Sequence, residues 1–282
     1  MTIMTRARIL LEDRIAPQID AFAWYRHQMV KPFLISGAVS MLNVGSSGGV
    51  ETLELLRRGN HVTTVEIGEG AAERTRRRAV RNGYAEHHIG LCGHILDAPL
   101  SGTYDGILML EVLEHIEEDF RALQRLTSFL KPGGRLILST PTASYGQLPG
   151  DTMSIREDGG HVRIGYDGPE LDEMLEAVDM IPLRRIHFGG ALTTLVSPGL
   201  QRPLDARPLT RRLGIALSFL TRPMMPVLEA IPGGARHPYC QLTLAVKRRV
   251  PMTNRPAQRT AIFESNGGST NNGGSHAHSP QS

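Results

Sequence analysis

Two carboxylates and two imidazoles in this sequence are placed where they could act together on a substrate. Glu111, Glu114 and His115 recur within one turn of chain, so all three side chains can point into one cavity. His161 lies in a later glycine-rich loop, and such loops reach the same end of a parallel sheet. Carboxylate and imidazole groups suit a divalent cation that keeps open positions. The residues therefore predict a metal centre or, without a metal, a site in which His115 or His161 is the general base.

The same residues also have a purely structural interpretation. Glu111 could cap the following helix, while Glu114 and His115 could form the polar start of that helix. The loop around His161 is long and polar, and long ordered loops in enzymes are usually functional. Tyr145, His161, Arg163 and Tyr166 are candidate contacts for an acceptor substrate.

A glycine turn, MLNVGSSGG at residues 41–49, is the second candidate site. An apolar strand ends at Val44, and the glycines that follow let the backbone turn sharply and approach a ligand. A helix over 52–58 would direct its free N-terminal amides at that ligand and favour negative charge. The run HVTTVEIG then ends in Glu66, 21 residues after Gly45, where a carboxylate can accept hydrogen bonds from a ribose. The alternative is that the glycines serve only tight turns.

Alternating strands and helices must position these groups. Apolar periodicity predicts further helices at 69–81, 119–130 and 168–178, and strands at 85–91, 107–110, 135–139, 181–188 and 241–247, with a turn at 131–134. Such alternation predicts an α/β fold with a parallel sheet covered on both faces.

Three further segments flank or interrupt this domain, which we expect to span 39–249. Residues 1–38 are expected to be mainly helical, packing on the sheet edge or forming a lid. Residues 192–236 form an insertion before the last strand, which predicts a cap over the acceptor pocket. The alternative for this insertion is an amphipathic contact with a membrane surface, because apolar residues stand beside arginines. Residues 250–282 are polar and predict a disordered tail.

Composition restricts the class of protein. The 282 residues carry a formal net charge of +3 and are 40% hydrophobic, which is ordinary for a globular protein. Cys92 and Cys240 have no metal-like or redox-like spacing, so a disulfide framework is not expected. No signal peptide or membrane span is evident, and we expect a cytoplasmic protein. The basic helix ERTRRRAVR is read as a solvated face rather than a nucleic-acid patch.

The segments LNVGSSGG, TTVEIG, YDGILMLEVLEHI and LKPGGRLILSTP together resemble the class I S-adenosylmethionine-dependent methyltransferases. The resemblance implies a Rossmann-like, doubly wound sheet of seven strands with an antiparallel last strand. It also implies cofactor-binding roles. Gly45 and Gly49 would approach the methionine end and Glu66 would hold the ribose, while His94 and Ile95 would lie beside the adenine and Leu110 and Glu111 would line the pocket. The family's second glycine is Ser47 here, and Asn43 and His94 replace its usual acids.

The EVLEH segment resembles the Glu-x-x-Glu-His metal site of ubiquinone-pathway O-methyltransferases and small-RNA 2′-O-methyltransferases. This likeness implies Mg²⁺ held by Glu111, Glu114, His115 and His161. By analogy the metal would lower the pKa of the acceptor hydroxyl and orient it towards the methyl group.

The expected activity is therefore methyl transfer from S-adenosylmethionine, most simply to an oxygen of a small molecule, a sugar or a lipid-linked glycan. One alternative is an RNA 2′-O-methyltransferase that uses Arg74 to Arg81 as a phosphate contact. Another is a catalytically silent protein with a degraded cofactor pocket. Nitrogen as the methylated atom and the oligomeric state are left open by the sequence.

Overall fold

The computed structural model describes residues 13, 20–145, 152–154, 156–157, 159–196, 211–231 and 237–249. The expectations for the rest of residues 1–19 and for the polar tail from residue 250 lie outside these described residues.

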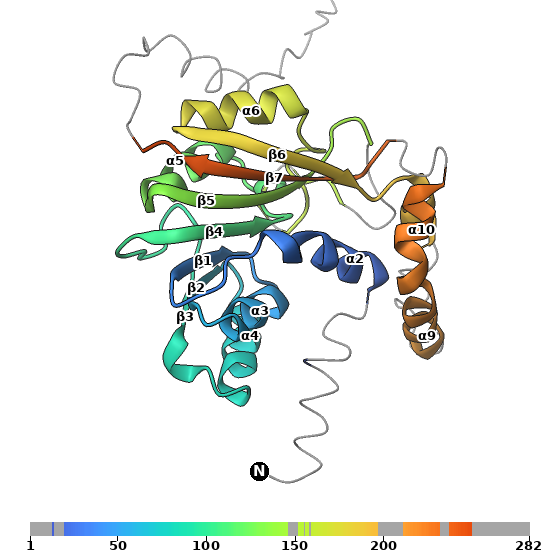
Figure 1. Ribbon diagram of the computed structural model, residues 1–282, viewed down its shortest axis with the longest axis horizontal. Coiled ribbons are helices and arrows are strands. Elements are labelled where there is room, and N and C mark those ends of the chain that lie inside the picture. The colour runs from blue at the N-terminus through green and yellow to red at the C-terminus, as the bar shows by residue number, and fades with distance from the viewer. Residues whose placement is uncertain are drawn as a thin grey trace, which may run out of the picture. The chain divides into compact units, whose positions relative to one another are not determined.

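Seven strands form one mixed sheet in the order β3-β2-β1-β4-β5-β7-β6 (Figure 1). β1 to β5 run parallel, whereas β7 is antiparallel to both β5 and β6. This arrangement confirms the predicted doubly wound fold with an antiparallel last strand. The strands are β1 (Ser40–Val44), β2 (His61–Glu66), β3 (His88–Cys92), β4 (Tyr104–Leu110), β5 (Leu130–Pro141), β6 (Met180–Phe188) and β7 (Cys240–Lys247).

The central strands β1 and β4 are mostly buried, because helices cover both faces of the parallel part of the sheet. Met41, Leu42, Ile107 and Leu108 are fully buried in β1 and β4. The helices between the strands are α3 (Val50–Arg57), α4 (Glu69–Arg81), α5 (Asp119–Ser128) and α6 (Gly168–Ala177), with short 3₁₀ turns η3 (Ala85–His87) and η4 (Leu113–His115).

The turn predicted at 131–134 is wrong as a boundary, because β5 already begins at Leu130. Tyr104 pairs with Leu130 and Gly106 pairs with Arg135, so residues 131–134 form an irregularity within the ladder. Gly133 has φ of +79°, which is the backbone freedom that this irregularity requires.

Before the sheet, Asp20 caps α2 (Ala21–Val30) by accepting a 2.8 Å hydrogen bond from the amide of Ala23, and η2 (Lys31–Phe33) follows. Between β6 and β7 lie α7 (Ala191–Thr194), α9 (Arg211–Thr221), η6 (Arg222–Met224) and α10 (Met225–Ala230). Both α9 and η6 contact α2. Within the described ranges, none of the helices combines the length and the apolar character needed to cross a membrane.

Candidate functional site

A cavity of about 360 Å³ lies at the carboxyl ends of β1, β2, β3 and β4. This is the edge where a doubly wound sheet binds its ligands. The structure brings most of the predicted cofactor residues to it. Those lining the cavity are Gly45, Ser47, Glu66, His94, Ile95 and Glu111, together with the predicted base His115.

The turn after β1 depends on Gly45. Its φ is +68°, and a Cβ atom there would lie far inside van der Waals contact with Cγ2 of Val112. Ser47 also has positive φ, at 57°, so this serine occupies a backbone conformation that favours glycine. The turn therefore keeps the backbone geometry of a glycine-rich loop although one of its positions carries a side chain.

Arginines on α4 donate hydrogen bonds to carbonyl oxygens of this turn. Arg74 donates to the carbonyl oxygen of Ser47 at 3.3 Å, and Arg78 donates to the carbonyl oxygen of Gly48. Arg78 and Arg81 also bind the carboxylate of Asp13, which is fully buried. Much of the basic run of α4 is thus used in contacts within the protein.

Glu66, the last residue of β2, lines the cavity. The hydroxyl of Ser46 donates to Oε1 of Glu66 at 2.5 Å, and Ser46 Oγ lies 2.9 Å from Oγ1 of Thr75. Burial raises the pKa of Glu66, and the hydrogen bond from Ser46 and the charge of Arg74 oppose that rise. A carboxylate oriented in this way can accept hydrogen bonds from neighbouring hydroxyl groups.

Two predicted cofactor contacts differ from the structure. Gly49 lies outside the cavity lining and caps α3 with φ of +73°, where an added Cβ would come within 2.9 Å of Thr75 Cγ2. The absence of a side chain at Gly49 therefore allows the start of α3 to pack closely against Thr75 of α4. Leu110 also lies outside the lining and belongs to the hydrophobic core, because the strand alternation turns its side chain inward.

The substituted positions have contacts of their own. Asn43 donates to Oγ1 of Thr52 at 2.9 Å and so joins β1 to α3. His94 accepts from the amide of Leu96 through Nδ1, at 3.3 Å, and its Nε2 lies 2.7 Å from Oε2 of Glu157. Both His94 and Glu157 line the cavity, so the loop that contains Glu157 borders the predicted adenine end.

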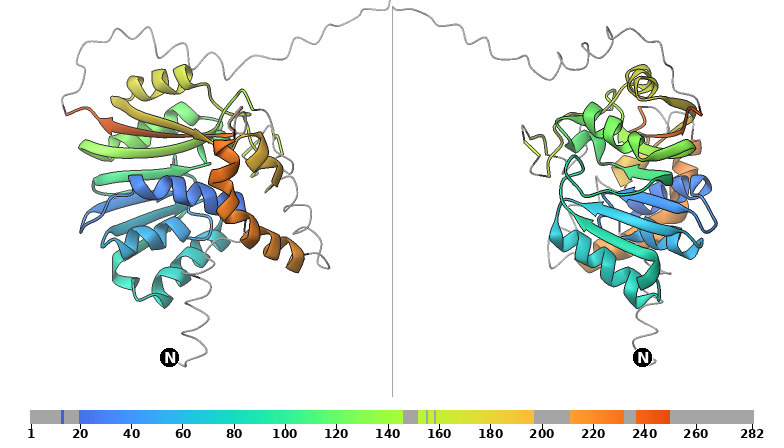
Figure 2. Two further views of the ribbon diagram at one scale, coloured as in Figure 1. Left: turned by 45° about the vertical axis from the view of Figure 1, so that its right-hand side comes forward. Right: turned by 90° about the vertical axis from the view of Figure 1, so that its left-hand side faces the viewer.

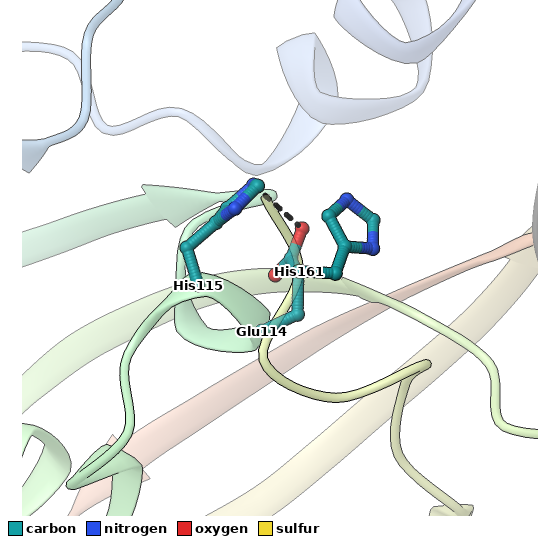
Figure 3. A group of neighbouring side chains, drawn as sticks. All are labelled: Glu114, His115 and His161. Carbon is teal, nitrogen blue, oxygen red and sulfur yellow. Dashed lines mark ion pairs between the residues drawn. The ribbon is translucent and has the colours of Figure 1, made fainter. Parts of the chain in front are cut away.

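Glu114, His115 and His161 form one cluster (Figure 3), and their candidate ligand atoms all lie within 4.8 Å of one another. Glu114 is fully buried, and its Oε1 lies 3.8 Å from Nε2 of His115. His115 directs Nδ1 at the carbonyl oxygen of Gly160, 2.9 Å away, and the rings of His115 and His161 are 4.6 Å apart, edge to face. Because a carbonyl can only accept, Nδ1 carries the proton and the neutral ring keeps its lone pair on Nε2.

Glu111 is not part of this cluster, contrary to the four-ligand prediction. Ser139 Oγ and Cys240 Sγ both donate to Oε1 of Glu111, at 2.7 and 3.1 Å. These two contacts from β5 and β7 fix the carboxylate, and the residue has φ of 52°. The donor set that remains is one carboxylate and two imidazoles.

Arg26 on α2 is a residue that the sequence reasoning missed. The charges of Glu111 and Glu51 outweigh the lowering effect of burial and raise the pKa of Arg26. His27 Nδ1 lies 3.4 Å from Oε1 of Glu51 on α3, so α2 brings a second basic side chain close to an acid. In the sequence this arginine stands among aromatic residues of a helix, and nothing in that pattern distinguishes it.

Arg163 and Tyr166, which are predicted acceptor contacts, also support the loop that contains His161. The Tyr166 hydroxyl donates to Asp119 at 2.8 Å, and its ring is fully buried. Arg163 pairs with Asp119 and Glu170 at 2.9 and 2.6 Å and stacks on Tyr166 at 3.9 Å. Tyr145 bonds to Thr194 Oγ1 at 2.5 Å, which links the loop after β5 to α7.

Residues 42–138 match the family model described as a methyltransferase domain. The ubiquinone biosynthesis O-methyltransferase of Xanthomonas axonopodis pv. citri (strain 306) is 28% identical over 130 residues, which cover 45% of this chain and 54% of that protein. The chain thus spans about half the length of the curated relatives it matches.

Solved structures share the fold at low sequence identity. The N-methyltransferase NodS of Bradyrhizobium japonicum WM9, in complex with S-adenosyl-L-homocysteine, has a TM-score of 0.54 at 16% identity and covers 86% of this chain and 96% of its own. The [4+2]-cyclase SpnF has a TM-score of 0.56 at 20% identity, with 78% and 80% covered. Since one neighbour is named as a cyclase, the fold alone does not define the reaction.

Proposed function

We propose that this chain, of which residues 42–138 match a methyltransferase domain, is a class I S-adenosylmethionine-dependent methyltransferase that methylates an oxygen of a small molecule, a sugar or a lipid-linked glycan. The observation that carries the proposal is the position of His115. Its ring lines the cofactor cavity and also belongs to the cluster with Glu114 and His161. An imidazole between a donor cavity and a polar cluster suits removal of a proton from an acceptor hydroxyl.

The donor, when bound, supplies a methyl group activated on a sulfonium. Glu66 accepts hydrogen bonds from its ribose hydroxyls, and His94 and Ile95 border its adenine. The backbone at Gly45 lies beside its methionine part. Arg26, which is close enough to Glu111 for that charge to raise its pKa, would pair with the donor carboxylate. These residues would hold the donor in the cavity that His115 also lines.

His115 acts through Nε2, which holds the lone pair because Nδ1 donates to Gly160. As the new oxygen–carbon bond forms, the sulfur–carbon bond breaks, and Nε2 takes the hydroxyl proton. The electron pair of the broken bond stays on sulfur, which becomes a neutral thioether. Alignment of the hydroxyl with the methyl group supplies most of the rate, and the base adds roughly 10²–10⁴-fold.

A divalent cation held by the cluster is the alternative version of the proposal, in which His115 is a ligand and not the general base. Glu114, His115 and His161 would hold it, and it would polarise the acceptor oxygen. With one carboxylate and two imidazoles the donor set suits Mn²⁺, Fe²⁺ or Zn²⁺ better than Mg²⁺, which prefers oxygen ligands. His115 then contributes Nε2 as a ligand, and a buried Glu114 carboxylate supplies the compensating negative charge.

The activity is tested with radiolabelled donor and fractions of a cell extract, followed by mass identification of the labelled product. We expect a methyl ether in the product, and the His115→Ala variant should lose at least about a hundredfold in turnover. His87→Ala, an exposed histidine outside the cavity lining, is the matched control and should stay active. Labelled nitrogen, or full activity of His115→Ala, would contradict the proposal.

The cation is tested separately by titrating Mn²⁺ into the full chain and recording the decrease of its free spectrum by electron paramagnetic resonance. One bound ion is expected, lost in Glu114→Gln or His161→Ala and retained in Glu111→Gln. If turnover is unchanged in chelator and no Mn²⁺ binds, the metal version is refuted and the metal-free base mechanism remains.

A further inference from the structure

The helices α9 and α10 expose large apolar side chains to solvent. We call these residues the cap face, and they are Leu213, Phe219, Leu220, Met224, Val227 and Ile231. Their exposed fractions range from 39% at Phe219 to 71% at Leu220, so none of these side chains is buried in the core. Figures 1 and 2 show α9 and α10 as successive parts of one arm beside the sheet. An apolar patch of this kind usually marks a site of interaction.

The polarity of α9 is inverted relative to that of a helix on a water-soluble surface. Gly214, Ser218 and Thr221 are buried, whereas Leu213 and Leu220 point outward. An ordinary surface helix places its leucines inward and its polar residues outward. Helices that face lipid show this pattern, with small residues packed against the protein and large apolar residues turned outward.

The two charged residues between 213 and 231 are both turned into the protein. Arg222 is 6% exposed, and its guanidinium lies over the rings of Phe219 and Trp24 at 4.1 and 5.9 Å. Glu229 accepts hydrogen bonds from the amides of Gly189 and Gly190, both at 2.8 Å. These contacts anchor the arm at two points and leave the cap face without a charged group.

We propose that the cap face inserts into the interfacial layer of a lipid bilayer and docks the enzyme on a membrane surface. A hydrocarbon partner needs no hydrogen bonds from the face, and the outward side chains offer none. A protein partner would be expected to meet hydrogen-bonding groups at about one per 100–200 Å². The eleven residues of α9 are too few to span a bilayer, so the contact lies in the plane of the surface.

The inference is tested by flotation of the full chain, without donor, on vesicles of phosphatidylcholine and of equal phosphatidylcholine and phosphatidylglycerol. Wild type should float with both, and more strongly with the anionic vesicles because α9 begins with Arg211 and Arg212. The double variant Leu220→Ser/Val227→Ser should partition at least about tenfold more weakly. A second pair, Met224→Ser/Ile231→Ser, should show the same direction of change.

Leu183→Ser is the matched control, because Leu183 is 60% exposed on β6 and lies outside the cap face. It should float like wild type. The proposal is overturned if wild type fails to float at millimolar lipid, or if Leu183→Ser weakens binding as much as the cap variants. It is also overturned if the protein does not float and light scattering finds a dimer that the cap variants convert to a monomer. The cap face would then bind a second copy of the chain. Since no donor is present, these outcomes do not depend on methyl transfer.

Discussion

Adding a single methyl group at Gly45 should destabilise the cofactor turn by two separable mechanisms. An alanine at the φ of +68° would occupy the left-handed backbone region, which costs a residue with a side chain about 1–2 kcal/mol. The new Cβ would also overlap Cγ2 of Val112, and overpacking of this kind costs about 1–3 kcal/mol. Gly45→Ala should therefore lose about 2–5 kcal/mol in the free energy of unfolding and should bind the donor more weakly.

The chain offers a control that isolates the first mechanism. Gly83 has φ of +86°, and no atom lies within 4 Å of its added Cβ, so Gly83→Ala should lose only the left-handed penalty. Adding Val112→Ala to Gly45→Ala should recover the part of the stability loss that comes from overpacking. Urea unfolding of wild type, the two single variants and the double variant measures this recovery as a coupling energy. If Gly45→Ala is no more destabilising than Gly83→Ala, or shows no coupling to Val112, the reasoning is refuted.

Three other substitutions test further parts of the account. Glu66→Gln should bind donor at least about tenfold more weakly in calorimetry than Glu69→Gln, an exposed neighbour, because the ribose loses a charged acceptor; equal affinities would remove Glu66 from the ribose site. Ser47→Gly should raise the free energy of unfolding by about 1 kcal/mol, since Ser47 has φ of 57°, and a decrease in urea unfolding would contradict this. Burial raises the pKa of Asp13, but Arg81, Asn82 and Arg78 outweigh burial and hold it below its ordinary 3.8. The carboxylate therefore stabilises the fold above that value, and this stabilisation is lost as the pH falls through the lowered pKa. Asp13→Asn should lower the free energy of unfolding by about 3 kcal/mol at neutral pH and by progressively less in acid. A difference between wild type and variant that does not change with pH would contradict the assignment.

The sheet could be predicted because its strands are local apolar runs. Residues 41–44 and 107–110 carry enough buried side chains to identify β1 and β4 without any long-range information. Glu66 could be placed for a related reason, since the end of β2 and the turn after β1 must meet at one edge of the sheet. The irregularity at 131–134 was missed because a proline and two glycines favour a turn as strongly as a bulge.

The rest of the site depends on contacts between residues far apart in the chain. The orientation of Glu111 is set by Ser139 and Cys240, which are 28 and 129 residues away. Arg26 is near Glu51 and Glu111 only because the fold brings α2 close to α3 and to the end of β4. Local sequence patterns carry no information on either contact.

The inverted polarity of α9 illustrates the same limit. This helix lies in the insertion at 192–236, whose sequence is interpreted as a cap or a membrane contact but does not tell which side chains are turned inward. The structure places Ser218 and Thr221 against the protein and Leu220 in solvent. The cap and membrane interpretations of residues 192–236 therefore differ only in what covers that outward face.

The central claim is that the turn at Gly45 and the carboxylate of Glu66 together bind one molecule of S-adenosylmethionine. Isothermal titration of S-adenosylhomocysteine, the demethylated product, into the full chain tests it most directly. We expect saturable binding of one molecule, with an affinity at least about tenfold lower in Glu66→Gln. No heat and no thermal shift at millimolar ligand would contradict the account.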